Sequence, residues 1–443
     1  MMTFRNVRVF FCILGAVFFL LNGSSASAED QRLNLQAIVD QARPGDTILL
    51  KPGIYHGPVI INKPLTIRSE GEVPVELRNS NDLPVLTIHA DYTTVSGLHI
   101  IDEKVKEEPT VLVTGHNAIL EGLSIRTAGN GIMVRDADEG TLDNSAIIGI
   151  AEGIRMADRG NGVDIFNGHR WNITDNTIRN VHDGIYMEGS DDTLVVGNVI
   201  EQSRYGVHCM YTHRTIIQRN DSHLNVTGAM IMTASHVSVI GNMFTKQSEN
   251  VNSQGILLYD THESTVKDNT AYGNRVGLYV ELSTGNILEN NRVSSNFVGL
   301  QLIESSGNTI QRNQFIANVA DAQARGSEEN NISENYWDNF RGIDTDRDGK
   351  SEISYSINPF FQGLVQKRPA FQLFFQSPGM VFLEGLYETE RERWTTDTAP
   401  LMVPPDNETS AGDPEGAAMT GIAGIILLVS TGVLFIWMRR RNI

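Results

Sequence analysis

Cysteine is scarce in this sequence, which has only Cys12 and Cys209 among 443 residues. We expect Cys12 to be removed with an N-terminal leader, so the mature chain has one thiol and cannot form an internal disulfide. Positive charge is also in deficit, because 35 Lys and Arg against 53 Asp and Glu give a net charge of −18. This balance argues against nucleic acid as a partner, and it makes a cationic partner or a metal easier to accept than a polyanion.

Several signatures of enzymes are missing as well. The chain has no phosphate-binding glycine loop, no serine nucleophile elbow and no HExxH zinc motif. The adjacent carboxylates Asp191 and Asp192 resemble the acid pair of a glycosidase. They lie in a predicted turn, however, where aspartate is common for conformational reasons. We therefore assign no catalytic residue.

The N-terminus has the features of an export signal. Within residues 1–28, Arg5 and Arg8 precede an apolar core at 9–21 and an Ala-Ser-Ala site at 26–28. This order predicts a cleaved signal peptide. A retained membrane anchor is disfavoured because the apolar run is short.

The C-terminus has the features of a membrane anchor. After a Pro- and Asp-rich linker at 395–415, residues 416–438 form an apolar run long enough to span a bilayer. Three arginines follow, so the positive-inside rule places the tail 439–443 in the cytoplasm and the rest of the chain outside it. The sequence thus predicts an exported protein that is tethered to the cytoplasmic membrane.

Between about positions 162 and 337 the chain repeats itself at an interval of roughly 22 residues, which is within the range of solenoid repeats. One asparagine marks each repeat, at Asn176, Asn198, Asn220, Asn242, Asn269, Asn291, Asn313 and Asn335. Glycine keeps the same interval, at Gly162, Gly184, Gly206, Gly228, Gly255, Gly277 and Gly299. Each series contains a single longer step, which follows Asn242 in one and Gly228 in the other. A fixed period of this length indicates a solenoid, in which each repeat is one rung stacked on its neighbours.

The pattern within one repeat predicts strands. In residues 184–200, apolar residues alternate in three short runs separated by Gly, Asn, Asp or Ser. Three strands and three turns per rung predict an all-β fold, a right-handed parallel β-helix, which we place at residues 46–340. A leucine-rich repeat would need its own leucine and helix pattern, which is absent. The asparagine at one fixed turn predicts a ladder of side-chain hydrogen bonds from rung to rung.

Two insertions interrupt the period. The first lengthens the step from Asn144 to Asn176, and the second lies within residues 246–252. Both insertions fall between the asparagine turn and the next glycine, so we expect them to project from the same corner of the solenoid. Insertions on one face often mark the binding face of a repeat protein, although surface loops also tolerate insertions without function.

Both ends of the solenoid need a cover. In segment 29–45, residues 33–42 have helical spacing, which predicts a short helix that caps the N-terminal end. The apolar residues on its predicted buried face are Leu35, Ile38, Val39 and Ala42. At the other end, residues 360–394 contain Phe374, Phe375 and Met380 outside the repeat. We expect this segment to cap the C-terminal end or to dock on a partner.

Residues 341–359 form an acidic loop. Three aspartates at alternate positions precede Gly349, an arrangement that resembles the start of a calcium-binding loop. The twelfth position, where a bidentate Glu belongs, is Tyr355. The candidate Ca²⁺ ligands are therefore Asp344, Asp346, Asp348 and Glu352. The alternative is a solvated acidic turn that closes the solenoid.

The repeat also predicts which side chains are neighbours on the outer surface. If the residue after each repeat glycine points into the core, the second and fourth residues after it point outward. This register places His208 and Met210 directly over Met230 and Met232 of the next rung. One imidazole and three thioethers form a soft donor set that favours copper(I). A shift of one residue would exchange His208 for Cys209 and remove the site.

The same outer face has a second interpretation. Phe166, Tyr186 and Glu188 point outward beside the methionines, and a stripe of methionine and aromatic residues is often a protein-binding surface. We therefore predict a partner contact at these three residues. The histidines that share one turn position lie two or more rungs apart, so they cannot form one tight site. These histidines are His169, His213 and His262.

Several of these stretches together resemble the NosD family. They are ADRGNGVDIFN (157–167), NVHDGIYMEGSDDTLVVGNVIE (180–201), SRYGVHCMYTH (203–213) and ENYWDNFRGIDTDRDGK (334–350). The resemblance extends from the N-terminal cap to about residue 386. Members of this family are exported β-helical components of the system that matures nitrous oxide reductase.

The resemblance implies a non-enzymatic protein that works with an ATPase and a permease in an ABC-type complex. It implies that the protein receives copper from a lipoprotein chaperone and helps to build the multicopper sulfide centre of nitrous oxide reductase. The family stretch RYGVHCMY contains His208 and Met210, and the next rung adds Met232. Many members lack a span such as 416–438, so this chain departs from the family pattern at its C-terminus. Copper and sulfur both stay open as cargo.

Two other classes of function also stay open. The first is a carbohydrate-active or carbohydrate-binding β-helix, since many β-helices cleave polysaccharides. The second is a scaffold that holds the reductase beside the transporter without a metal of its own. Converging soft ligands on the outer face would favour the copper protein, whereas converging carboxylates and basic residues would favour the carbohydrate class.

Overall fold

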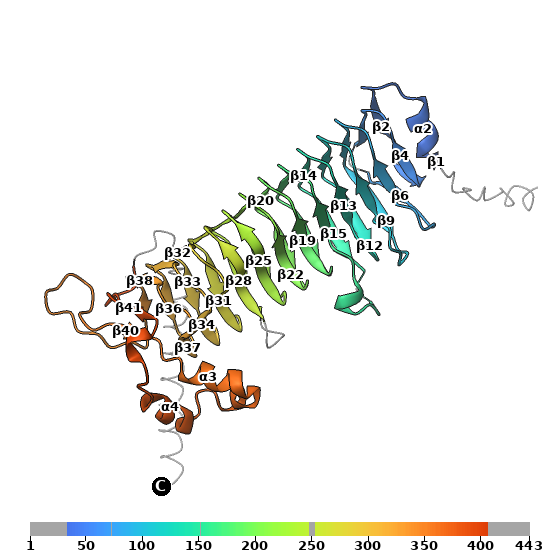
Figure 1. The fold of residues 1–443 in the computed structure, drawn as a ribbon. Helices are drawn as coiled ribbons and strands as arrows, with labels where there is room; N and C mark the ends of the chain where they lie inside the picture. Colours follow the sequence, from blue (N-terminus) through green and yellow to red (C-terminus); the bar gives the residue numbers. More distant parts are fainter. Residues whose placement is uncertain (1–32, 72, 151, 248–252, 406–443) are drawn as a thin grey trace, which may run out of the picture.

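The computed structural model describes residues 33–71, 73–150, 152–247 and 253–405. They form an all-β, right-handed parallel β-solenoid of about 13 turns, as predicted (Figure 1). Each full turn contributes one strand to each of three long sheets. We call these sheet A, sheet B and sheet C.

Sheet A contains 14 strands among the described residues. They are β1 (Leu33–Asn34), β3 (Gly53–His56), β6 (Val75–Arg78), β9 (Leu98–Asp102), β12 (Ser124–Thr127), β15 (Ala146–Gly149), β18 (Thr177–Arg179), β21 (Val199–Glu201), β24 (Asp221–His223), β27 (Met243–Thr245), β30 (Thr270–Tyr272), β33 (Arg292–Ser294), β36 (Gln314–Ile316) and β39 (Tyr336–Trp337).

Sheet B contains 15 strands in the same part of the chain. They are β2 (Thr47–Leu50), β5 (Thr66–Ser69), β8 (Thr94–Ser96), β11 (Ile119–Glu121), β14 (Thr141–Asp143), β17 (Asn172–Thr174), β20 (Leu194–Val196), β23 (Ile216–Gln218), β26 (Ser238–Ile240), β29 (Thr265–Lys267), β32 (Ile287–Glu289), β35 (Thr309–Gln311), β38 (Asn331–Ser333), β41 (Thr396–Asp397) and β40 (Tyr355–Ser356).

Sheet C, which contains the predicted site, has 12 strands over the described ranges. They are β4 (Val59–Ile61), β7 (Leu86–Ile88), β10 (Val111–Val113), β13 (Ile132–Arg135), β16 (Val163–Phe166), β19 (Asp183–Glu188), β22 (Tyr205–Met210), β25 (Thr227–Ser235), β28 (Gln254–His262), β31 (Val276–Glu281), β34 (Val298–Ile303) and β37 (Ala320–Arg325).

Alternation along each strand builds the core. In β22, Val207 and Cys209 are fully buried, and Cys209 pairs in register with Met187 on one side and Ile231 on the other. Columns of this kind stack apolar side chains from rung to rung inside the solenoid. The repeat glycines serve the close approach of the rungs, since a Cβ on Gly184 would lie 2.5 Å from the carbonyl oxygen of Gly206.

The asparagine ladder predicted from the sequence is present. The Nδ2 of Asn198 donates to the Oδ1 of Asn220 at 3.0 Å, and Asn220 donates to Asn242 at 2.9 Å. Two further ladders use other turns, through Asn274 and Asn296 and through Asn286 and Asn308. These buried amides satisfy the backbone groups of the turns, which would otherwise be left without partners.

The helix α2 (Leu35–Gln41) covers the N-terminal end of the solenoid, and Asn34 caps it by accepting from the backbone N–H of Ala37. Leu35 and Val39 are buried as predicted. Ile38, which the helical spacing places on the same face, is 38% exposed. The buried face is therefore narrower than the sequence suggests.

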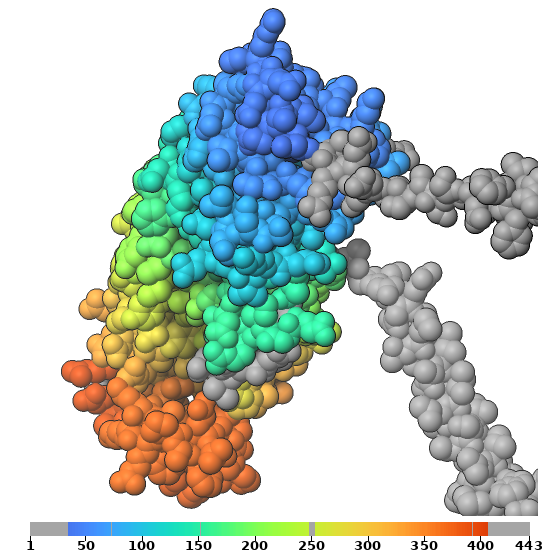
Figure 2. All heavy atoms as spheres, turned by 90° about the vertical axis from the view of Figure 1, so that its right-hand side faces the viewer, coloured from blue at the N-terminus to red at the C-terminus, as the bar shows by residue number. Residues whose placement is uncertain are grey.

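The first insertion contains the 3₁₀ helix η1 (Met156–Asp158). Figures 1 and 2 show it projecting from the side of the solenoid from which the C-terminal helices also project. Those C-terminal elements are α3 (Phe360–Lys367), η2 (Pro369–Phe374), α4 (Pro378–Gly385) and η3 (Arg391–Arg393). The insertion lies near the rungs of the predicted site, as the interruption of the period suggests.

Residues 395–405 differ from the predicted linker. The strand β41 pairs in parallel with β38 and antiparallel with β40, and so extends sheet B. Asp397 takes the next place in the asparagine ladder, where its Oδ2 accepts from the Nδ2 of Asn335 at 3.0 Å and from the Nε1 of Trp337 at 2.9 Å. The folded part of the chain therefore extends past the predicted boundary, because the ladder needs a final acceptor.

Over the described residues, no helix is both long and apolar enough to cross a bilayer. The predicted signal peptide (1–28) and the predicted transmembrane segment (416–438) lie outside the described residues.

Candidate functional site

The predicted copper ligands lie side by side on the outer face of sheet C. In the pairing of β22 with β25, His208 is in register with Met230, and Met210 is in register with Met232. Val207 and Cys209, which alternate with His208 and Met210 along β22, face the core. The structure therefore brings together the four residues that the sequence singles out.

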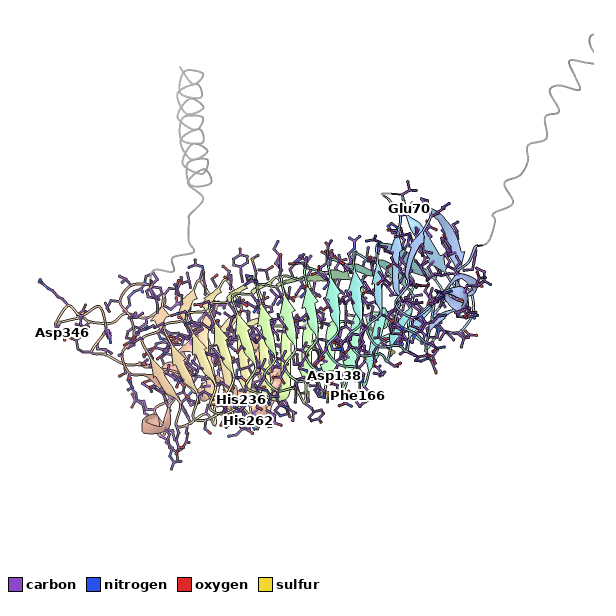
Figure 3. The ribbon with its side chains drawn as sticks, turned by 90° about the horizontal axis from the view of Figure 1, so that it is seen from above. Glu70, Asp138, Phe166, His236, His262 and Asp346 are labelled. Carbon is purple, nitrogen blue, oxygen red and sulfur yellow. The ribbon has the colours of Figure 1, made fainter. Side chains whose placement is uncertain are left out.

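Phe166 and Glu188 belong to the same row as Met210. The pairings of β16 with β19 and of β19 with β22 place Phe166 beside Glu188 and Glu188 beside Met210. Phe166 is 45% exposed and projects from the solenoid (Figure 3). The hydroxyl of Tyr186 donates to Glu188 at 2.6 Å and lies 3.5 Å from the sulfur of Met210. Tyr186 and Glu188 are therefore direct neighbours of the predicted metal ligands, and Phe166 lies one rung farther along the row.

His208 is held in a buried environment although its side chain leaves the core. Only 6% of the residue is exposed. The rings of Tyr186 and Tyr205 each lie with their centroids 4.9 Å from that of the imidazole. Packing between two tyrosines fixes the plane of the ring.

The two ring nitrogens of His208 have different surroundings. Nδ1 lies 2.9 Å from Oδ2 of Asp183. Nε2 is buried and has no hydrogen-bond partner among the described residues. A carboxylate at Nδ1 favours the tautomer with its proton on that atom, which leaves the lone pair of Nε2 free. A buried nitrogen without a partner is costly unless something binds it.

Asp183 is the anchor of this arrangement. Its carboxylate also accepts two hydrogen bonds from Arg204, at 2.8 and 2.7 Å, and is itself 1% exposed. Burial alone would raise the pKa of Asp183, but the hydrogen bonds from His208 and Arg204 outweigh it and hold the pKa below its usual value. The guanidinium of Arg204 in turn lies 4.3 Å from the ring centroid of Tyr205.

Sequence reasoning missed Asp183, Arg204 and Tyr205. The repeat does place Tyr205 in register with Asp183, immediately before the repeat glycines. A buried carboxylate next to the rung of His208 was the available signal. The outward positions predicted from the sequence, the second and fourth after each repeat glycine, do not include the position before the glycine, which Asp183 and Tyr205 occupy.

A groove of about 500 Å³ adjoins the site at the start of the sheet C strands. Its lining includes Met156 and Ala157 from the first insertion, Arg204 and Tyr205 from the site, and Leu257 from β28. The insertion therefore contributes one wall of the groove beside His208.

Cys209 points into the core with no exposed area. Burial raises the pKa of its thiol to about 12. It is thus a buried neutral thiol, as the alternation predicts, and not part of the outer patch.

The histidines at the shared turn position have separate local partners. Nδ1 of His213 lies 3.0 Å from Asp191, and Nδ1 of His262 lies 2.8 Å from Thr284. Asp192 accepts two hydrogen bonds from Arg214, at 2.7 and 2.9 Å. The neighbouring Asp191 and Asp192 are therefore neutralised by cationic or donor groups on the next rung and do not form a free acid pair.

The residues predicted for docking in the C-terminal segment have different surroundings. Phe374 is 53% exposed, whereas Met380 is buried in α4. The ring of Phe375 packs against Phe297 of the solenoid at 4.7 Å and against Phe361 of α3 at 4.8 Å. Phe375 therefore attaches the segment to the solenoid, Met380 is buried, and of the three predicted residues only Phe374 offers a large exposed surface.

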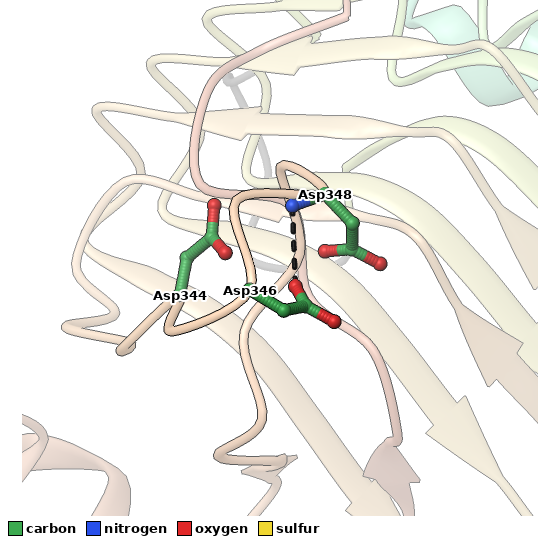
Figure 4. Close-up of side chains that lie close together, drawn as sticks. All are labelled: Asp344, Asp346 and Asp348. Carbon is green, nitrogen blue, oxygen red and sulfur yellow. Dashed lines mark hydrogen bonds between the residues drawn. The ribbon is translucent and has the colours of Figure 1, made fainter.

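The acidic loop brings Asp344, Asp346 and Asp348 together, with one oxygen of each within 4.8 Å of the others (Figure 4). Their carboxylates also accept from backbone N–H groups of the loop, as in the 3.2 Å bond from Asp348 N to Asp346. Glu352 instead accepts from the backbone N–H of Thr345 at 2.8 Å. Three of the four candidate Ca²⁺ ligands converge, and the fourth stabilises the turn.

Solved structures share the fold at low identity. The Dettilon tailspike protein is 12% identical with a TM-score of 0.50, over 66% of this chain and 64% of that chain. The A-module of mannuronan C-5 epimerase AlgE6 from Azotobacter vinelandii is 13% identical with a TM-score of 0.47, over 68% and 88% of the two chains. The family 28 exopolygalacturonase of Yersinia enterocolitica is 10% identical with a TM-score of 0.48, over 69% and 75%. At such identities the likeness extends to the fold alone.

Part of the chain matches the model of a known protein family. No curated protein matches the chain. Residues 145–346 match the family model described as NosD, periplasmic copper-binding protein. The matched range includes β19, β22 and β25, the rungs that carry His208 and its neighbours. This part of the chain is therefore similar to the NosD family.

Proposed function

We propose that this protein binds copper(I) outside the cytoplasm and passes it on during assembly of the multicopper centre of nitrous oxide reductase. Copper(I) is cargo here, bound transiently by Nε2 of His208 and the thioether sulfurs of Met210, Met230 and Met232. The family match supports the general role. The local geometry supports the site.

The observation that carries the proposal is the buried Nε2 of His208, which has no partner among the described residues. Its other nitrogen is held by Asp183, which fixes the tautomer needed for a ligand at Nε2. The methionines on the same and the next rung supply sulfur donors without any need for deprotonation. A neutral donor set of this kind favours the soft monovalent ion over Zn²⁺, Ca²⁺ or Mg²⁺.

The test is an anaerobic competition for copper(I) between the purified chain and a chromophoric chelator. We expect His208→Ala and Met210→Ala each to weaken the affinity tenfold or more. Met230→Leu removes only the sulfur and keeps the volume, so it tests the ligand without creating a cavity. His213→Ala is the matched control, because that histidine is also paired with an aspartate but is exposed. Unchanged affinity in the first three variants would remove the site, and absence of binding by the wild-type chain would favour a scaffold role.

Partners follow from the same proposal. We propose that a copper chaperone lipoprotein delivers the ion and nitrous oxide reductase receives it, with the permease and ATPase of an ABC transporter as the membrane partners. Tyr186 and Glu188 adjoin the ligands and Phe166 continues their row, so a protein that exchanges copper with the site would contact these residues. Nucleic acid is not a proposed partner. The proposed anchor in the cytoplasmic membrane is the segment 416–438.

The carbohydrate alternative has less support from the outer surface. The one adjacent acid pair weighed for it, Asp191 and Asp192, is engaged by His213 and Arg214. A polysaccharide-binding assay that gave a specific signal abolished by Asp191→Asn would reinstate this alternative.

We also propose Ca²⁺ as a ligand of the acidic loop, through Asp344, Asp346 and Asp348. The support is the convergence of three carboxylates on a tight turn that ends in Gly349. Limited proteolysis of the loop with Ca²⁺ and with a chelator tests this, with Asp346→Asn as the variant that should lose the protection.

A further inference from the structure

The column of repeat glycines ends at an aspartate. Asp321 takes the place of the glycine one repeat after Gly299, because β34 and β37 align Val298 with Ala320 and Leu300 with Ala322. A Cβ on Gly299 would lie 2.5 Å from the carbonyl oxygen of Asp321, as at the earlier glycines. A side chain fits at Asp321 because β37 is the last strand of sheet C. Its carboxylate therefore occupies the place where another rung would stack.

This carboxylate has no cation to balance it. Asp321 is 4% exposed, and neither of its oxygens makes a hydrogen bond of good geometry among the described residues, with Asn339 the nearby polar residue. Oδ1 of Asp338 is likewise buried and unpartnered there, while its other oxygen accepts from the backbone N–H of Ala317 at 2.5 Å. Within the described part of the chain, no ion pair involves Asp321 or Asp338.

Burial and the neighbouring Asp338 raise the pKa of Asp321 to about 7, against a smaller lowering effect of the nearby Asn339. Two adjacent carboxylates in a water-poor environment repel each other and lose their hydration, which is costly unless a cation or a proton compensates. The burial of unpartnered oxygens therefore points to something that binds them.

The space beside Asp321 is large enough for an ion with its water. A cavity of about 370 Å³ lies between the last rungs and the C-terminal helices. Its lining is rich in oxygen-bearing side chains: Asp321, Gln323, Asn339, Asn358, Gln376 and Glu384. Glu384 adds a third carboxyl group to the lining of this space. Burial raises its pKa as well, and it has no ion pair within the described ranges.

We propose that Asp321 and Asp338 bind a hard divalent cation of the Ca²⁺ class at the C-terminal end of the β-helix. The donors are carboxylate and amide oxygens, with no sulfur or imidazole among the described lining residues, which favours Ca²⁺ over copper. Ca²⁺ accepts six to eight oxygens, waters included, in irregular geometry, and so suits a roomy polar cavity better than Mg²⁺ does. The bound ion joins the last strand of sheet C to the segment that follows β39.

This site is distinct from the copper patch and from the acidic loop. Asp321 lies in β37, five rungs beyond β22, whereas Asp344, Asp346 and Asp348 form their own cluster in an exposed turn. The inference therefore stands or fails independently of the proposed function.

The test uses Tb³⁺ as a luminescent substitute for Ca²⁺ on the full-length chain in detergent. Tyr355 lines the cavity and stacks on Trp337 with ring centroids 4.6 Å apart, so these rings should sensitise an ion bound at Asp321. We expect emission that Ca²⁺ displaces, and a higher Tm with Ca²⁺ than with a chelator. Asp321→Asn and Asp338→Asn should each weaken the apparent Tb³⁺ affinity tenfold or more.

Two further variants keep the result decisive. Asp321→Gly restores the residue that the preceding rungs have at this position, so it removes the carboxylate with little risk to folding. Asp344→Asn in the acidic loop is the matched control and should keep the sensitised emission. Loss of the emission in Asp344→Asn but not in Asp321→Gly would overturn the proposal. A second result would also overturn it: a wild-type Tm that Ca²⁺ does not change, together with a higher Tm for Asp321→Asn than for the wild type. The two carboxyl groups would then share a proton instead of a cation.

Discussion

His208 and Cys209 are consecutive residues with opposite surroundings. The thiol of Cys209 packs among Met187 and Ile231 in the core, whereas the imidazole of His208 leaves the core and meets Asp183. Strand alternation alone decides this difference. The thiol, which suits a soft metal by its chemistry, is thereby unavailable, and the proposed copper site uses the imidazole and the methionines instead.

The surroundings of Cys209 predict its reactivity. The native chain should react with iodoacetamide at pH 8 at least a hundredfold more slowly than the unfolded chain, because burial raises the pKa of the thiol to about 12 and removes access. Mass spectrometry of the alkylated chain, with and without denaturant, measures this. Rapid labelling of the native chain would mean that the strand is in another register.

At the scale of the single element, the turn asparagines hold the rungs together. Asn220 donates to the carbonyl of Val195 and to Asn242, both at 2.9 Å, and accepts from Asn198. Asn220→Ala should lower the free energy of unfolding by about 3 kcal/mol, because buried backbone and amide groups lose their partners. Urea denaturation followed by circular dichroism checks this. Asn172→Ala, an exposed asparagine in β17, is the control and should change it by less than about 0.5 kcal/mol.

The repeat glycines make a second prediction for the elements. A Cβ at Gly184 would meet Cγ2 of Ile200 at 2.4 Å and the carbonyl oxygen of Gly206 at 2.5 Å. Gly184→Ala should therefore cost about 2 kcal/mol or more, since two rungs must separate. Gly363→Ala in α3 has nothing within 4 Å of the new methyl group and favours the helix, so the same thermal unfolding assay should find it neutral or stabilising.

Much of this architecture could be predicted because it depends on local periodicity. The constant repeat interval fixes which residues are in register, so His208 over Met230 and the asparagine ladder both follow from counting. Asp183 and Arg204 could not be placed in the same way. Asp183 is in register with Tyr205, so its bond to Arg204 runs diagonally between adjacent rungs and not along a row. The structure of residues 395–405 could not be predicted either, because β41 joins the sheet through a contact between segments 62 residues apart.

For the whole molecule, stability is a sum over rungs, and the ends are the weakest points. At the C-terminal end, Phe315 and Trp337 stack with centroids 4.2 Å apart, and Tyr355 continues the stack. Asp397 closes the asparagine ladder beside them. The C-terminal segment thus covers an apolar and polar end that would otherwise be open to solvent.

Removing a contact of this C-terminal segment should destabilise the last rungs only. Asp397→Ala removes the acceptor for Asn335 and Trp337, and we expect faster amide hydrogen exchange over β36 to β39 while the rungs near β22 stay unchanged. Thr398→Ala, at an exposed neighbour, should leave the exchange as in the wild type. Faster exchange spread evenly over all rungs would show that the solenoid unfolds as one unit instead.

The stacking of similar rungs also fixes the distance between any two of them as a multiple of the spacing between strands. Five steps separate β22 from β37 in sheet C, which corresponds to about 24 Å at roughly 4.8 Å per step. Removing one whole turn between them would shorten the reach from His208 to α3 by one such step while every remaining side chain kept its face. The distance between the proposed copper site and the C-terminal helices can therefore be adjusted in discrete increments, independently of the chemistry at either place.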